Sequence, residues 1–185
     1  HWLNPFPKIR YTERPDVVAA HLTEGSFVIL VDNSPTAIIL PTSFFDFLQD
    51  ADDFYFPVIT GTYLRMVRNI TMLVSVFVTP IYLLVDRGIV AFPEQWGFLM
   101  PQESYPIPLF WQFLILEIAV DGLKLASLNT PSSLGMSLSV IGALLLGELS
   151  ITAGWFIPQT ILLMAVIALA AFSQPNIELS YAFKF

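Results

Sequence analysis

Three ionisable residues stand in an otherwise apolar stretch of this chain and could act on ions. Glu117, Asp121 and Lys124 interrupt the segment Leu109–Leu128. If this segment is a helix, their spacing of four and then three residues places all three side chains on one face. An ionised side chain in hydrocarbon costs from about 3 kcal/mol upward, so these groups must face protein, water or each other. Two interpretations follow: a polar face that lines a cation pathway, or an interaction of Asp121 with Lys124 or Glu117 that only fixes helix packing.

A second pattern lies in the segment Leu134–Thr152, where small residues recur every four positions. These residues are Gly135, Ser139, Ala143 and Gly147. Such a ridge lets another backbone approach closely, which favours packing against a neighbouring helix or subunit over a direct role in lining a pore. The side chains of Ser137, Ser139 and Glu148 give the same helix polar atoms that a permeating ion could meet. Glu148 falls near one end of the segment and could instead be interfacial.

The composition indicates which solvent surrounds these segments. Of 185 residues, 55% are hydrophobic and only 12% are charged, with a mean hydropathy of +0.68. Because soluble domains devote about a quarter of their residues to charge, we expect an integral membrane protein. The chain has no cysteine, which excludes disulfides and thiolate sites within it. A net charge of -7 argues against a nucleic-acid partner.

The apolar residues are concentrated after residue 56, in a predicted membrane domain over residues 57–185. Its helices are expected at about residues 63–85, 109–128, 134–152 and 155–173. The first is long enough to cross about 30 Å of hydrocarbon, and Arg65 and Arg68 could reach lipid headgroups from its first turns. The connector Asp86–Pro108, rich in proline and aromatic residues, is expected to lie along the interface.

The last two segments are separated only by Ala153 and Gly154. So short a turn predicts either a hairpin that crosses the bilayer or a re-entrant pair. The distribution of basic residues predicts the orientation of the first span in the membrane. Only Arg87 lies in the loop after this span, whereas five basic residues lie before it or in its first turns: Lys8, Arg10, Arg14, Arg65 and Arg68. The N-terminal side is therefore expected to be cytoplasmic.

Residues 1–56 have a different pattern, typical of a small soluble segment. A helix is expected over Asp16–Glu24, with Thr12 as its N-cap. The runs Ser26–Val31 and Thr36–Leu40 flank the turn formers Asp32–Pro35 and predict a β-hairpin. One helix cannot cover both faces of strands this apolar, so we expect the missing partner segments upstream of this chain.

The segment Phe44–Leu48, with an acidic turn after it, has two interpretations. It is either an amphipathic approach to the membrane or a solvated surface helix.

The chain offers no recognisable catalytic constellation. It has no phosphate-binding glycine loop, no nucleophile elbow and no nucleophile beside a base. His1 and His21 have no plausible third ligand nearby in the sequence. We therefore expect no enzyme activity, no metal and no cofactor.

Several motifs resemble a known family. Asn4–Gly25 (NPFPKIRYTERPDVVAAHLTEG) and Val28–Pro35 (VILVDNSP) resemble the end of the cytoplasmic domain of GerA-family spore-germination A subunits. Gly61–Arg65 (GTYLR), Asp121–Pro131 (DGLKLASLNTP) and Ser137–Glu148 (SLSVIGALLLGE) are similar, more narrowly, to the branch of stage V sporulation protein AF. The resemblance covers essentially the whole chain, whereas members of the family are longer at both ends, so we expect a fragment.

The resemblance implies the end of a cytoplasmic α/β domain followed by an α-helical integral membrane domain. It also implies a homo-oligomeric channel of the spore inner membrane that releases ions during germination, together with other spore membrane germination proteins. The sign of Glu117 and Asp121 favours monovalent cations. Two other interpretations stay open: a non-conducting scaffold that organises germination receptors, and a secondary transporter, which would need inverted repeats.

Overall fold

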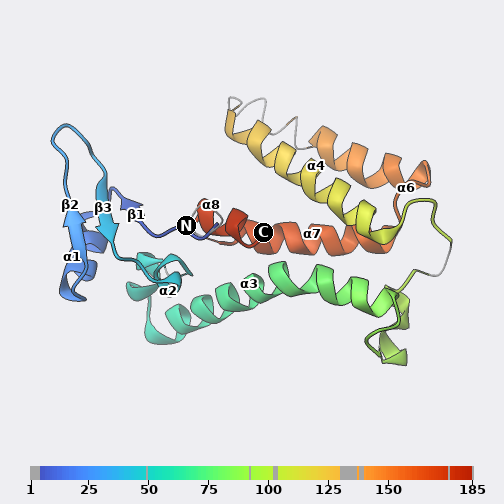
Figure 1. Cartoon of the computed structure of the whole chain (residues 1–185), viewed down its shortest axis with the longest axis horizontal. Coiled ribbons are helices and arrows are strands. Elements are labelled where there is room, and N and C mark those ends of the chain that lie inside the picture. The colour runs from blue at the N-terminus through green and yellow to red at the C-terminus, as the bar shows by residue number, and fades with distance from the viewer. Residues whose placement is uncertain are drawn as a thin grey trace. The chain divides into compact units, whose positions relative to one another are not determined.

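The computed structural model describes residues 5–48, 50–91, 93–101, 104–129, 137, 140–174 and 176–184. The chain divides into two compact units, His1–Val76 with Ala170–Phe185, and Phe77–Leu169. Helices α3 (Val58–Asp86) and α7 (Pro158–Phe172) each contribute residues to both units. Figure 1 shows a mostly helical chain with one small sheet.

The sheet has three antiparallel strands in the order β1 (Arg10–Thr12), β3 (Ala37–Leu40), β2 (Phe27–Ile29). Strands β2 and β3 pair with Phe27 opposite Leu40, so the predicted hairpin is confirmed, although both strands are shorter than expected. Strand β1 is an addition that the sequence analysis missed. It pairs with β3, with Arg10 opposite Ile39, and its three residues are too few to give an alternating pattern.

Helix α1 (Pro15–Thr23) lies close to its predicted position, but its N-cap differs from the prediction. The N-cap is Arg14, not Thr12, because Thr12 is the last residue of β1. The hydroxyl of Thr12 instead accepts a hydrogen bond from the Arg14 backbone N–H at 3.2 Å. Pro15 occupies the first turn, where a backbone N–H has no partner within the helix, so its missing N–H costs nothing. After the helix, Gly25 has φ +90°, the left-handed conformation that commonly ends a helix.

One face of the sheet is buried and the other is open. Ala37 and Ile39 of β3 are buried, as are Val17 and His21 of α1, which packs on the sheet. On the opposite face the alternating residues Tyr11, Phe27 and Ile29 are largely exposed. A single helix therefore covers only one of the two apolar faces.

The buried face predicts a difference between two isoleucines of the sheet. Ile39→Ala should lower the free energy of unfolding of this unit by about 2–5 kcal/mol, since the side chain is fully buried. Ile29→Ala, on the open face, is the matched control and should cost much less, because Ile29 is 47% exposed. Chemical unfolding of the full-length protein in detergent checks this. Equal effects of the two substitutions would contradict the assignment of the faces.

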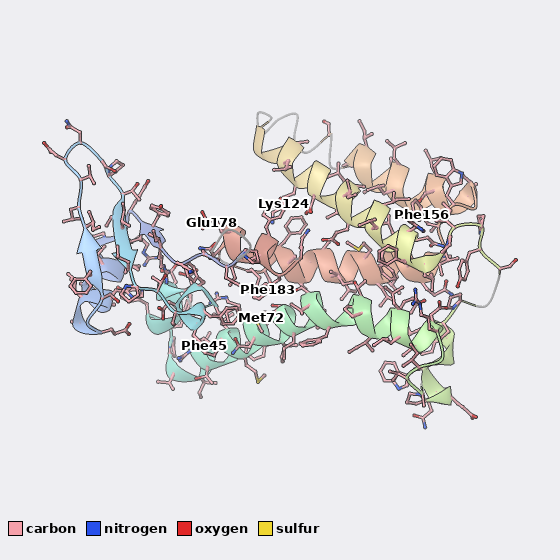
Figure 2. All side chains as sticks on the ribbon, viewed as in Figure 1. Phe45, Met72, Lys124, Phe156, Glu178 and Phe183 are labelled. Atoms are coloured by element: carbon pink, nitrogen blue, oxygen red, sulfur yellow. The ribbon has the colours of Figure 1, made fainter. Side chains whose placement is uncertain are left out.

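A second core in the same unit packs against the middle of α3, at Met72. It comprises Phe47 and Leu48 of α2 (Phe44–Leu48) and Leu179 of α8 (Ile177–Ala182), with Met72 and Phe183 packed against them (Figure 2). Phe44 and Phe45 of α2 stay exposed. The apolar side chains of α2 are thus divided between protein and solvent-accessible surface.

The other unit is a helical assembly around one core. Its elements include the end of α3, the short helix η2 (Glu94–Leu99), α4 (Leu109–Asn129) and most of α7. A further helix, Val140–Thr152, contains a π-helical turn, η3 (Leu145–Leu149), and ends in α6 (Ser150–Thr152). The buried core residues are Tyr82, Leu109, Phe113, Leu116, Phe156 and Met164.

Helix α3 is long and apolar enough to cross a membrane by length and composition, as predicted for residues 63–85. Only 11% of its apolar window is buried, which distinguishes it from the core helix of a soluble protein. Among the described residues, no other helix meets the same criteria. Val140–Thr152 and α7 are apolar but shorter, and α4 contains three charged residues. Gly154, with φ +71°, lies in the connection between Val140–Thr152 and α7. This connection runs over residues 153–157 and is longer than the expected two residues, because α7 begins at Pro158 and not at residue 155.

Candidate functional site

Helix α4 carries the three predicted charges as a stripe along one face. Because α4 is helical throughout Leu109–Asn129, Glu117, Asp121 and Lys124 lie on neighbouring turns of the same side. Each side chain is partly exposed. The stripe borders the face that buries Phe113 and Leu116 in the core, and on its other side Leu114 and Ile118 are exposed. The charges thus lie at the margin between protein core and open surface.

A buried amide fixes the first turn of α4. Gln112 is fully buried, and its Nε2 donates to the backbone oxygen of Ile107 at 2.7 Å. Its Oε1 accepts from the backbone N–H of Ile157 at 3.2 Å, just before α7. One side chain therefore ties α4 to the start of α7. The sequence analysis missed Gln112, although a lone amide within the apolar run Phe110–Leu116 is a usable signal for such a contact.

The helix Val140–Thr152 approaches α4 through a glycine. Gly142 is buried, and a Cβ built there would lie 2.6 Å from Leu123 Cδ2, so only glycine fits against this leucine without a shift. Leu123 lies between Asp121 and Lys124 in sequence, so the contact fixes the helix beside the charged part of α4. Gly142 was not among the predicted packing residues.

The predicted small-residue ridge uses a different face of that helix. Ala143 is exposed, and a Cβ at Gly147 would meet nothing within 4 Å. Ser137 and Glu148 are also exposed, and Glu148 lies within the π-helical turn η3. The remaining two candidates, Gly135 and Ser139, lie outside the described residues. The role of the ridge stays a prediction.

The first turns of α3 contain a buried ion pair that the sequence analysis did not foresee. Arg68 was expected to reach lipid headgroups, but its guanidinium pairs with the carboxylate of Asp53, whose side chain is 2% exposed. Arg68 also donates to the backbone oxygen of Leu48 at 3.4 Å. The expectation was wrong because a preceding acidic residue, brought close by the fold, is a better partner than solvent for this guanidinium.

The local sequence places Asp53 for this role. Asp50 caps the short helix η1 (Ala51–Phe54), and in return Asp53 Oδ2 accepts from the Asp50 backbone N–H at 3.4 Å. The following chain turns back so that Gly61 of α3 lies against the Asp53 backbone oxygen, where a Cβ would not fit. Gly61 therefore permits the close approach that the ion pair needs.

Polar contacts also join α3 to the end of α7. Gln174 Nε2 donates to the Arg68 backbone oxygen and to the Thr71 hydroxyl, both at 3.3 Å. The Ser173 hydroxyl donates to Thr71 Oγ1 at 2.8 Å. The backbone and side chains around Arg68 thus connect η1, α3 and the segment that follows α7.

A second, exposed cluster links the N-terminus of α1 to η1. Arg14 pairs with Asp16 at 2.8 Å and with Asp52 at 2.6 Å, and the Tyr55 hydroxyl donates to Asp16 at 2.8 Å. The hydrogen bonds from Arg14 and then Tyr55 hold the pKa of Asp16 well below its usual value, and those to Asp16 and Asp52 raise the pKa of Arg14. Because the folded-state pKa of Asp16 is depressed, its contribution to stability is complete above the unfolded-state value near 3.9. That contribution is lost as the pH falls further.

The two aspartates of η1 give a matched test of burial. Asp53→Asn should destabilise the protein by about 3–5 kcal/mol, because it leaves the Arg68 charge buried and unpaired. Asp52→Asn, whose carboxylate is 57% exposed, should change stability little. Thermal unfolding of the full-length protein in detergent measures both. A thermal midpoint for Asp53→Asn equal to that of Asp52→Asn would show that the pair does not hold α3.

Comparison with known proteins identifies the family. The family model described as Bacillus/Clostridium GerA spore germination protein matches residues 1–185. The chain belongs to the GerA family. This agrees with the resemblance of its N-terminal and helical motifs. No solved structure matches the chain.

Curated relatives include proteins of sporulation and germination. The chain is 37% identical over 181 residues to stage V sporulation protein AF of Bacillus subtilis (strain 168), which covers 98% of this chain and 37% of the relative. It is 30% identical over 185 residues to spore germination protein GerLA of Bacillus cereus, covering 98% and 38%. It is 29% identical over 184 residues to the uncharacterized membrane protein YfkQ of Bacillus subtilis (strain 168), covering 98% and 36%. The chain thus spans about a third of the length of these relatives.

Proposed function

We propose that this chain is part of a subunit of an oligomeric ion channel that acts in spore germination, in the spore inner membrane. The segment before α3, which contains the sheet, lies on the cytoplasmic side, and α3 crosses the bilayer. Germination is supported by the GerA family assignment and by relatives named as spore germination proteins. A membrane location is supported by the length and apolar composition of α3, and by the relative named as a membrane protein.

The charged stripe of α4 carries the proposal. Glu117, Asp121 and Lys124 are partly exposed at the edge of the core of their own unit. In hydrocarbon, the exposed part of an ionised side chain in such a position would be costly, which favours cover by a second subunit or by water. A ring of subunits that turn these stripes toward a common axis would bring water to the exposed part of these side chains and create a polar path. Two carboxylates against one ammonium favour cations along that path.

Charge-neutralising substitutions of the stripe test the proposal. Glu117→Gln or Asp121→Asn in the full-length protein should slow cation release from germinating spores, because each removes a negative charge along the path. The control is Glu13→Gln, which removes an exposed carboxylate from the N-terminal unit and should leave release unchanged. Release is measured with an ion-selective electrode and protein abundance by immunoblot. Normal release from both stripe variants at normal abundance would contradict the proposal.

A non-conducting scaffold is the second candidate, favoured by the open small-residue ridge. Exposed Ala143 and the empty space around Gly147 leave the described part of this ridge accessible to another helix. As a scaffold, the protein would assemble through the ridge and organise other germination proteins of the membrane without carrying ions. The secondary-transporter alternative has no comparable observation in its favour.

The ridge has its own prediction, which concerns assembly. Gly147→Leu should abolish oligomers of the full-length protein, because a bulky side chain prevents close backbone approach. Ile141→Phe is the control, since Ile141 lies on the same helix, is 53% exposed and stands on another face than Gly147. Size-exclusion chromatography with light scattering in detergent gives the oligomeric mass. An oligomeric mass of Gly147→Leu equal to that of the native protein would show that the ridge is not part of the interface between subunits. Oligomers of the native protein that conduct no ions in liposomes would favour the scaffold.

A further inference from the structure

Exposed aromatic side chains gather at one end of the helical unit formed by residues 77–169. They come from three separate segments: η2, the first turn of α4, and the turn before α7. Their exposed fractions are 52% for Trp96, 63% for Phe98, 50% for Phe110, 53% for Trp111 and 62% for Trp155. Trp96 stacks on Phe98 and Phe110 meets Trp111 edge to face, so the rings form pairs on the surface.

Buried hydrogen bonds hold these three segments at a common level. Gln112 joins the backbone of Ile107, before α4, to that of Ile157, before α7. The hydroxyl of Tyr82 on α3 donates to the backbone oxygen of Leu99 at the end of η2, at 2.9 Å. All three segments are therefore tied to the end of the core that contains Tyr82, Leu109 and Phe156. Phe156 is labelled in Figure 2.

The same level corresponds to the C-terminal end of α3. That helix ends at Asp86, whose carboxylate accepts from the Tyr105 hydroxyl at 3.3 Å. The turns of α3 that precede Asp86 carry mostly apolar side chains. Polar and charged residues, such as Asp86, Arg87 and Glu94, lie at the end of the helix and just after it. The aromatic rings thus lie where an apolar helix surface gives way to a polar one.

We propose that Trp96, Phe98, Phe110, Trp111 and Trp155 form a belt that lies in the lipid headgroup layer at the C-terminal end of α3. Tryptophan suits this layer because its ring is apolar while its N–H can bond to headgroups or water. A soluble partner protein would not require rings from three separate segments to lie at one level along the helices. The proposal rests on the membrane location proposed above and adds the depth in the bilayer at which these aromatic side chains lie.

Tryptophan fluorescence in the full-length protein measures that depth. Variants that keep only Trp111 or only Trp155, with every other tryptophan replaced by Phe, are reconstituted into phosphatidylcholine vesicles. The vesicles carry bromine either near the carbonyl end of the acyl chains or near their methyl end. The control keeps no native tryptophan and carries Phe77→Trp. Phe77 lies nine positions before Asp86 on α3 and is 52% exposed, hence about 13 Å deeper along the helix.

The ratio of shallow to deep quenching distinguishes the outcomes. It should exceed one for Trp111 and for Trp155, and it should fall below one for Phe77→Trp. If Phe77→Trp is quenched most by deep bromine while Trp111 and Trp155 are unquenched, or are themselves quenched most by deep bromine, the belt is overturned and the membrane location stands. If no variant is quenched by either lipid, the membrane location fails and the belt fails with it.

Discussion

In the membrane location proposed above, the free energy of a charge in hydrocarbon is the constraint on which the arrangement of this chain depends. This free energy is about 3 kcal/mol or more for each ionised group, which exceeds the stabilisation that most single contacts supply. The chain meets it in two ways. At the start of α3, Arg68 is paired with Asp53 inside its own unit. On α4, the stripe of Glu117, Asp121 and Lys124 lies partly exposed at the margin of the core.

These two solutions have different consequences for function. The Asp53 and Arg68 pair, with Gly61 and the Gln174 amide around it, makes a polar junction from η1 to α3 and the segment after α7. This junction fixes η1 against the N-terminal half of α3. The α4 stripe has partly exposed charges instead, which suits a surface completed by assembly.

Local patterns could be predicted from the sequence, whereas contacts between distant segments could not. Helix α1, the hairpin of β2 and β3, and the apolar length of α3 each follow from turn residues or hydropathy within one segment. Strand β1 escaped because its partner, β3, lies far along the chain. The same holds for Arg68 with Asp53, Gly142 with Leu123, and Gln112 with Ile157. For the stripe, helical spacing was enough to predict that the three side chains share one face. Its position at the margin of the core could be seen only in the structure, from the burial of Phe113 and Leu116.

Thiol accessibility along α4 tests most directly whether the stripe lines an ion path. This chain has no native cysteine, and any cysteine elsewhere in the full-length protein is first replaced by serine. Asp121→Cys in the full-length protein is reconstituted into liposomes and treated with a positively charged thiol reagent while cation flux is recorded. Ile118→Cys, 64% exposed on the neighbouring apolar surface, is the control. The account predicts that the reagent blocks flux through Asp121→Cys and leaves Ile118→Cys unaffected. Flux through Asp121→Cys that continues after complete labelling would contradict it.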